Sequence, residues 1–210
     1  MGEVLEDEAE EEAVESVPEE TPAASPALAV SLTAGWGLAH DARVAHGPRV
    51  GVSLGGGRLH GELAAATDLP LVLEDPELRV ELARHRLLAG ARVRLAGGER
   101  GGLEGAFGLA WLRYRRTSRA QGGLVATATR RSDHLVLAAR VEGSLRLGAG
   151  LSLVLALGVD GVVRPPELRI EELDGAMTSW ATLRRWQSRA ALALRWRFTR
   201  ASARTSREDP

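Results

Sequence analysis

Residues that could carry out covalent chemistry are few in this chain. It contains no cysteine, which excludes a thiolate nucleophile and a thiolate metal site. The best candidate for a nucleophile is Ser132, which is followed directly by Asp133 and His134. Neighbouring residues of a strand point to opposite faces, so these three side chains cannot form a proton relay by spacing alone. We interpret them as a solvated loop end, and we expect no enzymatic activity.

The histidines and glycines indicate no metal or cofactor site. The histidines lack a metal-binding spacing such as HxxxH. The glycine run at 55–57 is not followed by a helix that could bind phosphate. We therefore expect neither a metal nor a cofactor. The histidines are His40, His46, His60, His85 and His134.

Ionised residues give a clearer pattern, because they alternate with small or apolar residues along several segments. Side chains two residues apart in a strand share a face, so a closed sheet would gather these charges on one side. Ions inside a narrow lumen must be paired. We expect a lumen charge network of both signs, formed by Arg58, Glu62, Arg92, Arg94, Glu104, Arg140, Glu142, Arg146 and Arg195.

Long β-strands would position these residues. From 135 to 147 and from 151 to 163 every second residue is uncharged, and a glycine-containing turn at 148–150 joins the two runs. This is the pattern of a β-hairpin. Each run has about 13 residues, whereas strands of soluble proteins have roughly 5 or 6 and a membrane-spanning strand needs ~9 to 11.

The same alternation predicts eight strands, and therefore an all-β fold, an eight-stranded antiparallel up-and-down barrel. Short glycine turns follow the second, fourth and sixth strands, and longer polar loops follow the others. The expected strands are 27–38, 49–55, 58–67, one that ends at 95, 103–112, 135–147, 151–163 and 186–198. The expected loops are 40–48, 68–77, 115–133 and 164–183.

An apolar strand face can line a soluble barrel or can face lipid, and two features favour lipid. The apolar faces of the last three strands carry no charge, while the opposite faces carry both signs. Aromatic residues gather at both ends of the apolar face, as they do at the two membrane interfaces. We expect a membrane-spanning barrel with an interface girdle of Trp36, Trp111, Trp186, Trp196 and Phe198.

The last strand ends on the alternating residues Leu192, Leu194, Trp196 and Phe198. This ending resembles the C-terminal insertion signal of bacterial outer-membrane proteins, and 27–198 as a whole resemble the small OmpA/OmpX-like outer-membrane barrels. The resemblance implies a location in the bacterial outer membrane, contact with its lipids and recognition by its barrel assembly machinery. No secretory signal is visible in the sequence, and we expect one to lie upstream.

Composition separates the two ends of the chain from the barrel. Residues 1–26 hold ten acidic residues and no basic one, which predicts a disordered acidic periplasmic arm that could dock on a basic periplasmic partner. Residues 199–210 are expected to form a flexible C-terminal tail. The rest of the chain has nine more arginines than acidic residues. These arginines alternate with leucines rather than forming a run, so we expect no nucleic-acid binding.

An eight-stranded barrel has an interior just wide enough for side chains to fill it. We therefore expect a plugged polar lumen and a non-enzymatic role in anchoring or surface interaction. Three alternatives stay open: a narrow channel for small solutes, a lipid-modifying outer-membrane enzyme, and a soluble lipocalin-like binder whose apolar face points inward. The sequence indicates no particular ligand.

Overall fold

A computed structural model describes residues 28–40, 44–74, 78–120, 129–165, 167–171, 177–182 and 184–199. These residues form a closed barrel of eight strands and a separate two-stranded hairpin. Within them, no helix is long and apolar enough to cross a membrane. The expected acidic arm at 1–26 lies outside the described residues, as does nearly all of the expected tail at 199–210.

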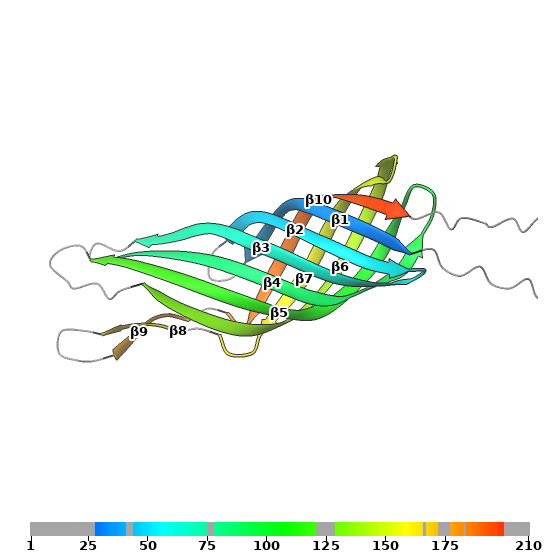
Figure 1. Ribbon diagram of the computed structural model, residues 1–210. Helices are drawn as coiled ribbons and strands as arrows, with labels where there is room; N and C mark the ends of the chain where they lie inside the picture. The colour runs from blue at the N-terminus through cyan, green and yellow to red at the C-terminus, as the bar shows by residue number, and fades with distance from the viewer. Residues whose placement is uncertain are drawn as a thin grey trace, which may run out of the picture.

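All neighbouring strands of the barrel are antiparallel and follow one another around it, except where the last strand closes on the first (Figure 1). The barrel strands are β1 (Ala29–His40), β2 (Val44–Gly56), β3 (Leu59–Glu74), β4 (Leu78–Gly97), β5 (Gly101–Ala120), β6 (Arg130–Gly148), β7 (Leu151–Val162) and β10 (Trp186–Thr199). The closing pair β1 and β10 runs in register from Ala29↔Thr199 to His40↔Ser188. The expected eight-stranded up-and-down barrel is confirmed.

Three tight turns lie at one end of the barrel, which we call the turn end. They join β2 to β3, β4 to β5 and β6 to β7. In the last of these turns Ala149 has φ 37° and Gly150 has φ 79°, and two positive φ values in a row are the mark of a type I′ hairpin turn. The first residue of β1 and the last residue of β10 lie at this end too.

The opposite end, which we call the loop end, differs from expectation because its strands are longer. The expected loop at 68–77 is mostly strand, since β3 continues to Glu74 and β4 begins at Leu78. Likewise β5 continues to Ala120, and β6 begins at Arg130. The extensions of β5 and β6 are rich in arginine, yet their backbone groups still pair across strands.

The expected loop at 164–183 is likewise only partly a loop. It contains a short hairpin of β8 (Glu167–Glu171) and β9 (Met177–Thr182), with a register shift between Leu168 and Arg169. This hairpin lies at the loop end of the barrel (Figure 1). It is a separate sheet and takes no part in the barrel closure.

The barrel wall is apolar on the outside. Large side chains of the expected outward faces are exposed by about half or more, for example Leu109 at 53%, Leu137 at 56% and Leu155 at 54%. Charged residues of the opposite faces are buried inside, such as Glu104 and Arg195 at 3% and 4%. The apolar strand faces therefore point outward, and the alternative in which they point inward is wrong.

Candidate functional site

Several charged residues inside the barrel form a compact group in the half nearer to the turn end, which we call the lower network. Strict alternation places each of them on the inner face of its strand. Its six members come from five strands and are Glu62 of β3, Arg92 of β4, Glu104 of β5, Arg140 and Glu142 of β6, and Arg195 of β10.

The lower network is held by direct ion pairs between arginine and glutamate. Arg195 Nη1 donates to Glu104 Oε2 at 2.7 Å, and Arg140 Nε donates to Glu142 Oε1 at 2.6 Å. Arg92 lies in the middle, 3.3 Å from Glu62, 3.5 Å from Glu104 and 3.6 Å from Glu142. Further contacts join Arg140 to Glu62 and Arg195 to Glu142.

These six side chains are only 4–11% exposed. Within these six residues three carboxylates balance three guanidinium groups, and the more exposed Arg197 also lies 3.7 Å from Glu104. Buried ions without partners would be strongly unfavourable, and this pairing offsets the cost of removing them from water. Chemically, the network ties five strands together across the lumen.

Three of the nine arginines and glutamates expected in the lumen lie elsewhere. Arg58 and Arg146 are exposed at the turn end, and their placement in the lumen network was wrong. Arg94 is half-buried near the same end, and it forms no ion pair with any other residue that the structure describes. Alternation gives the correct face for a residue, but it does not tell where the lumen ends and water begins. Residues next to a turn therefore reach solvent.

A second charged group, which we call the upper group, lies nearer to the loop end and was missed as a site. Its centre is Asp160 of β7, 2% exposed. One oxygen of Asp160 accepts a hydrogen bond from Arg86 at 3.0 Å, and the other accepts one from Arg189. Arg49 lies beside them. Each of these four residues lies on the inward face of its strand, so alternation was a signal that could have found them.

Beside the upper group and beyond it toward the loop end, apolar side chains fill part of the lumen, and we call them the apolar plug. Leu112, Val136 and Val162 in it have no exposed surface. Gln187 crosses this layer and donates to the Tyr114 hydroxyl at 3.1 Å. The buried members of the apolar plug are Leu82, Leu88, Ala110, Leu112, Tyr114, Val136 and Val162. The expected polar lumen is therefore only part of the filling of the loop-end half, where these apolar side chains lie together with the buried Arg84 and Asp68 ion pair, 2.8 Å apart.

The triplet at 132–134 has the alternating directions that its spacing implies. Asp133 points outward and accepts two hydrogen bonds from Arg113, at 2.8 and 3.2 Å. This guanidinium lowers the pKa of Asp133 below its ordinary value. His134 points the other way, donates from Nδ1 to the Arg164 carbonyl at 2.6 Å and lies edge-on to Tyr114. Asp133 and His134 thus each have a structural partner, and they point away from each other.

The five expected interface aromatics lie on the outer wall, and each is at least 36% exposed. Trp186 pairs with Gly161 near the loop end, whereas Trp196 pairs with Leu151 directly after a tight turn. The two therefore mark opposite ends of the apolar wall. At the loop end the guanidinium of Arg113 covers the Trp111 ring at 4.3 Å. A charged group above an indole ring is typical of the level where lipid meets water.

Solved structures with the same architecture are barrels of bacterial outer membranes. The major outer membrane protein of Thermus thermophilus has a TM-score of 0.62 at 17% identity, over 81% of this chain and 99% of that one. Neisserial surface protein A has a TM-score of 0.51 at 10% identity, over 81% and 97%. Ail of Yersinia pestis has a TM-score of 0.50 at 11% identity, over 83% and 100%. No family model and no curated protein matches the chain.

The chain has the fold of the small eight-stranded outer-membrane β-barrels. The closed eight-stranded topology and the apolar exterior both agree with this assignment. The expected resemblance to small outer-membrane barrels is thereby confirmed, and these neighbours agree with the expected location in the outer membrane. In barrels of this type the short turns face the periplasm and the loop end faces the outside of the cell.

Proposed function

We propose that this outer-membrane barrel is a non-conducting surface-interaction protein that binds sulfated or phosphorylated glycans through arginines at its loop end. The observation that carries the proposal is a pair of like charges on neighbouring strands. Arg115 of β5 lies directly opposite Arg131 of β6. Both are exposed, and neither forms an ion pair with an acidic residue among the residues that the structure describes.

Like charges directly opposite each other destabilise a strand pair, unless an anion lies between them. A second such pair is found one strand away, where Arg79 of β4 lies opposite Arg119 of β5. Arg79 is near two acidic residues, Glu74 at 4.0 Å and Glu81 at 3.6 Å. Together the four arginines give the outer wall of β4 to β6 an excess of positive charge, which we call the arginine wall.

The height of the arginine wall favours a ligand outside the hydrocarbon. Arg115 and Arg131 lie beyond Trp111 on the way to the loop end, where the wall meets water. Arginine forms two parallel hydrogen bonds with a sulfate or phosphate group. Two guanidinium groups side by side therefore suit a glycan that carries several such groups. The Ail barrel has been solved with the heparin analogue sucrose octasulfate, a ligand of the same chemical class.

The filled interior supports a role without solute transport. The lower network and the apolar plug occupy successive levels of the lumen, and an eight-stranded barrel leaves little room beside its side chains. We expect the full chain to give no stepwise conductance in planar lipid bilayers. Regular single-channel steps would contradict the non-conducting part of the proposal.

The glycan part is tested by isothermal titration calorimetry, in which sucrose octasulfate is added to the full chain in detergent micelles and the dissociation constant is measured. The double variant Arg115→Ser/Arg131→Ser should bind at least tenfold more weakly, because two charge-assisted contacts are lost. The matched control is Arg58→Ser/Arg146→Ser, which removes the same charge from exposed positions at the turn end. Equal weakening by both variants, or no binding by the unmodified chain, would contradict a binding role of the arginine wall.

A further inference from the structure

The upper group borders a small cavity inside the barrel. Its volume is about 30 Å³, which has room for one or two water-sized particles. Four guanidinium groups from four different strands line it, together with one carboxylate, that of Asp160. The remaining lining residues are mostly alanine and glycine. The four arginines are Arg49, Arg86, Arg140 and Arg189.

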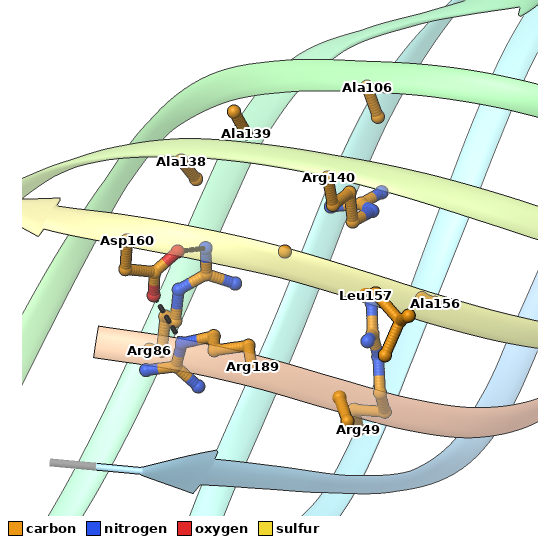
Figure 2. Close-up of a pocket in the computed structure, with 12 residues that line it drawn as sticks. Arg49, Arg86, Ala106, Ala138, Ala139, Arg140, Ala156, Leu157, Asp160 and Arg189 are labelled. Atoms are coloured by element: carbon orange, nitrogen blue, oxygen red, sulfur yellow. Dashed lines mark hydrogen bonds and ion pairs between the residues drawn. The ribbon is translucent and has the colours of Figure 1, made fainter. Parts of the chain in front are cut away.

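Positive charge is in excess around this cavity. Asp160 is shared by Arg86 and Arg189, as the dashed lines in Figure 2 show. Arg140 is paired with Glu62 and Glu142 of the lower network, so these carboxylates are already engaged. Because the six residues of the lower network balance one another in charge, the three other arginines of the cavity face one carboxylate, which leaves two positive charges uncompensated.

Arg49 differs from the other three arginines because its guanidinium group has no acidic partner within the described parts of the chain. It is half-buried on the inner face of β2, and it forms no hydrogen bond or ion pair within the described parts of the chain. Two further donors lack a partner although they are fully buried, Nε of Arg86 and Nη2 of Arg189. A buried donor without an acceptor is unfavourable, and a buried cation without a counter-ion is more so.

We propose that this cavity binds one small monovalent inorganic anion of the size of chloride or bromide. Such an anion would accept hydrogen bonds from Arg49 and from the free donors of Arg86 and Arg189. It would also compensate part of the excess charge, which a water molecule cannot do. The cavity volume and the alanine and glycine walls exclude a large organic anion. The site is internal and independent of the arginine wall on the outside.

The direct test is bromide-containing crystals of the full chain in detergent, examined by anomalous diffraction. A bromide peak within hydrogen-bond distance of Arg49 and Arg86 is the expected result. Absence of a peak in the cavity at high bromide concentration would overturn the proposal. Peaks confined to exposed arginines such as Arg58 or Arg146 would overturn it as well, because they would show ordinary surface binding.

A solution test uses thermal unfolding of the micellar protein at constant ionic strength, with bromide replacing gluconate. Gluconate is too large for the cavity. Bromide should raise the unfolding temperature saturably by a few degrees, because a ligand that binds only the folded state stabilises it. In Arg49→Met the apparent bromide affinity should fall at least tenfold, whereas Arg146→Met should behave like the unmodified chain.

The Arg49→Met variant also distinguishes loss of bromide binding from a general loss of the fold. Removing an uncompensated buried charge should leave the unfolding temperature in gluconate equal to or above that of the unmodified chain. A variant that unfolds at lower temperature in gluconate and keeps its full response to bromide would overturn the assignment of Arg49 to an anion site.

Discussion

At the scale of single residues, the lumen depends on glutamates that each serve several arginines. Glu142 contacts Arg92, Arg140 and Arg195. Replacing it by glutamine keeps the shape but removes the charge, so three guanidinium groups share two carboxylates. We expect Glu142→Gln to lower the free energy of unfolding by about 3 to 5 kcal/mol, the usual result of breaking a buried ion network.

This prediction is checked by unfolding the full chain in lipid vesicles with urea, with tryptophan fluorescence as the measure of the folded fraction. Glu99→Gln is the matched control, since Glu99 is exposed in the turn between β4 and β5. It should unfold at nearly the same urea concentration as the unmodified chain. If the two variants lost equal stability, the lower network would not contribute in the way that its geometry indicates.

The Arg113 and Asp133 pair, on the outer wall above Trp111, gives a pH-dependent prediction. Its hydrogen bonds lower the pKa of the Asp133 carboxyl. The stabilisation by this pair is therefore fully present above the ordinary aspartate pKa of ~3.9, and it is lost as the pH falls through the lowered value. In Arg113→Gln the Asp133 midpoint should rise toward the ordinary value. A ¹³C NMR titration of the carboxyl carbon measures both midpoints, and equal midpoints would contradict the pairing.

At the scale of strands, close packing depends on glycines where neighbouring backbones approach. Gly90 of β4 lies directly opposite Gly108 of β5. A Cβ atom on Gly108 would lie 2.4 Å from the Ala89 carbonyl oxygen and 2.8 Å from the Gly90 Cα, so the strands would have to separate. Gly108→Ala should lower the free energy of unfolding by roughly 1 to 3 kcal/mol. Gly143→Ala is the control, because nothing lies within 4 Å of its added Cβ.

Both glycine variants can be compared by the same urea unfolding in vesicles. Gly143→Ala should be neutral or slightly stabilising, because alanine restricts the unfolded chain more than glycine does. A Gly143→Ala variant that was less stable than Gly108→Ala would show that steric contact between strands is not the cause.

The strands also show what could be predicted from the sequence. Alternation gave the inner and outer faces correctly in β6, β7 and β10, because a shift of one residue would move every charge into lipid. It failed at the loop end, where the arginines of 115–119 lie in a strand that water reaches on both sides. Because both faces of this strand segment meet water, its residues need not alternate between polar and apolar. Its sequence therefore resembles that of a loop.

The candidate site, too, could be predicted from the sequence only in part. Residues of the lower network were predicted from their face alone, but their pairing was not, because contacts across the lumen depend on the stagger between strands. The apolar plug was missed for a related reason. Leu88 and Leu112 occupy inner positions, and a leucine on an inner face cannot be distinguished by pattern from one that faces lipid.

At the scale of the whole molecule, the barrel reverses the usual order of a soluble protein, with buried ion pairs inside and most of its leucines on the outer wall. Exposing that outer wall to water would be strongly unfavourable, since apolar area costs roughly 25 cal/mol per Å². We expect the refolded full chain to show a β-type circular dichroism spectrum only with detergent or lipid vesicles. The folded form should also migrate differently from the boiled form in a gel.

A single substitution in the outer wall sharpens this expectation. Leu155 of β7 is 54% exposed and lies between the two aromatic ends of the wall. An arginine on the lipid face costs about 2 to 4 kcal/mol near the middle of the bilayer and nearly nothing near its edges. Leu155→Arg should therefore destabilise the barrel in vesicles far more than Leu147→Arg, which lies beside a tight turn. Equal effects of the two substitutions, or monodisperse β-structure in plain buffer, would mean that this wall does not face lipid.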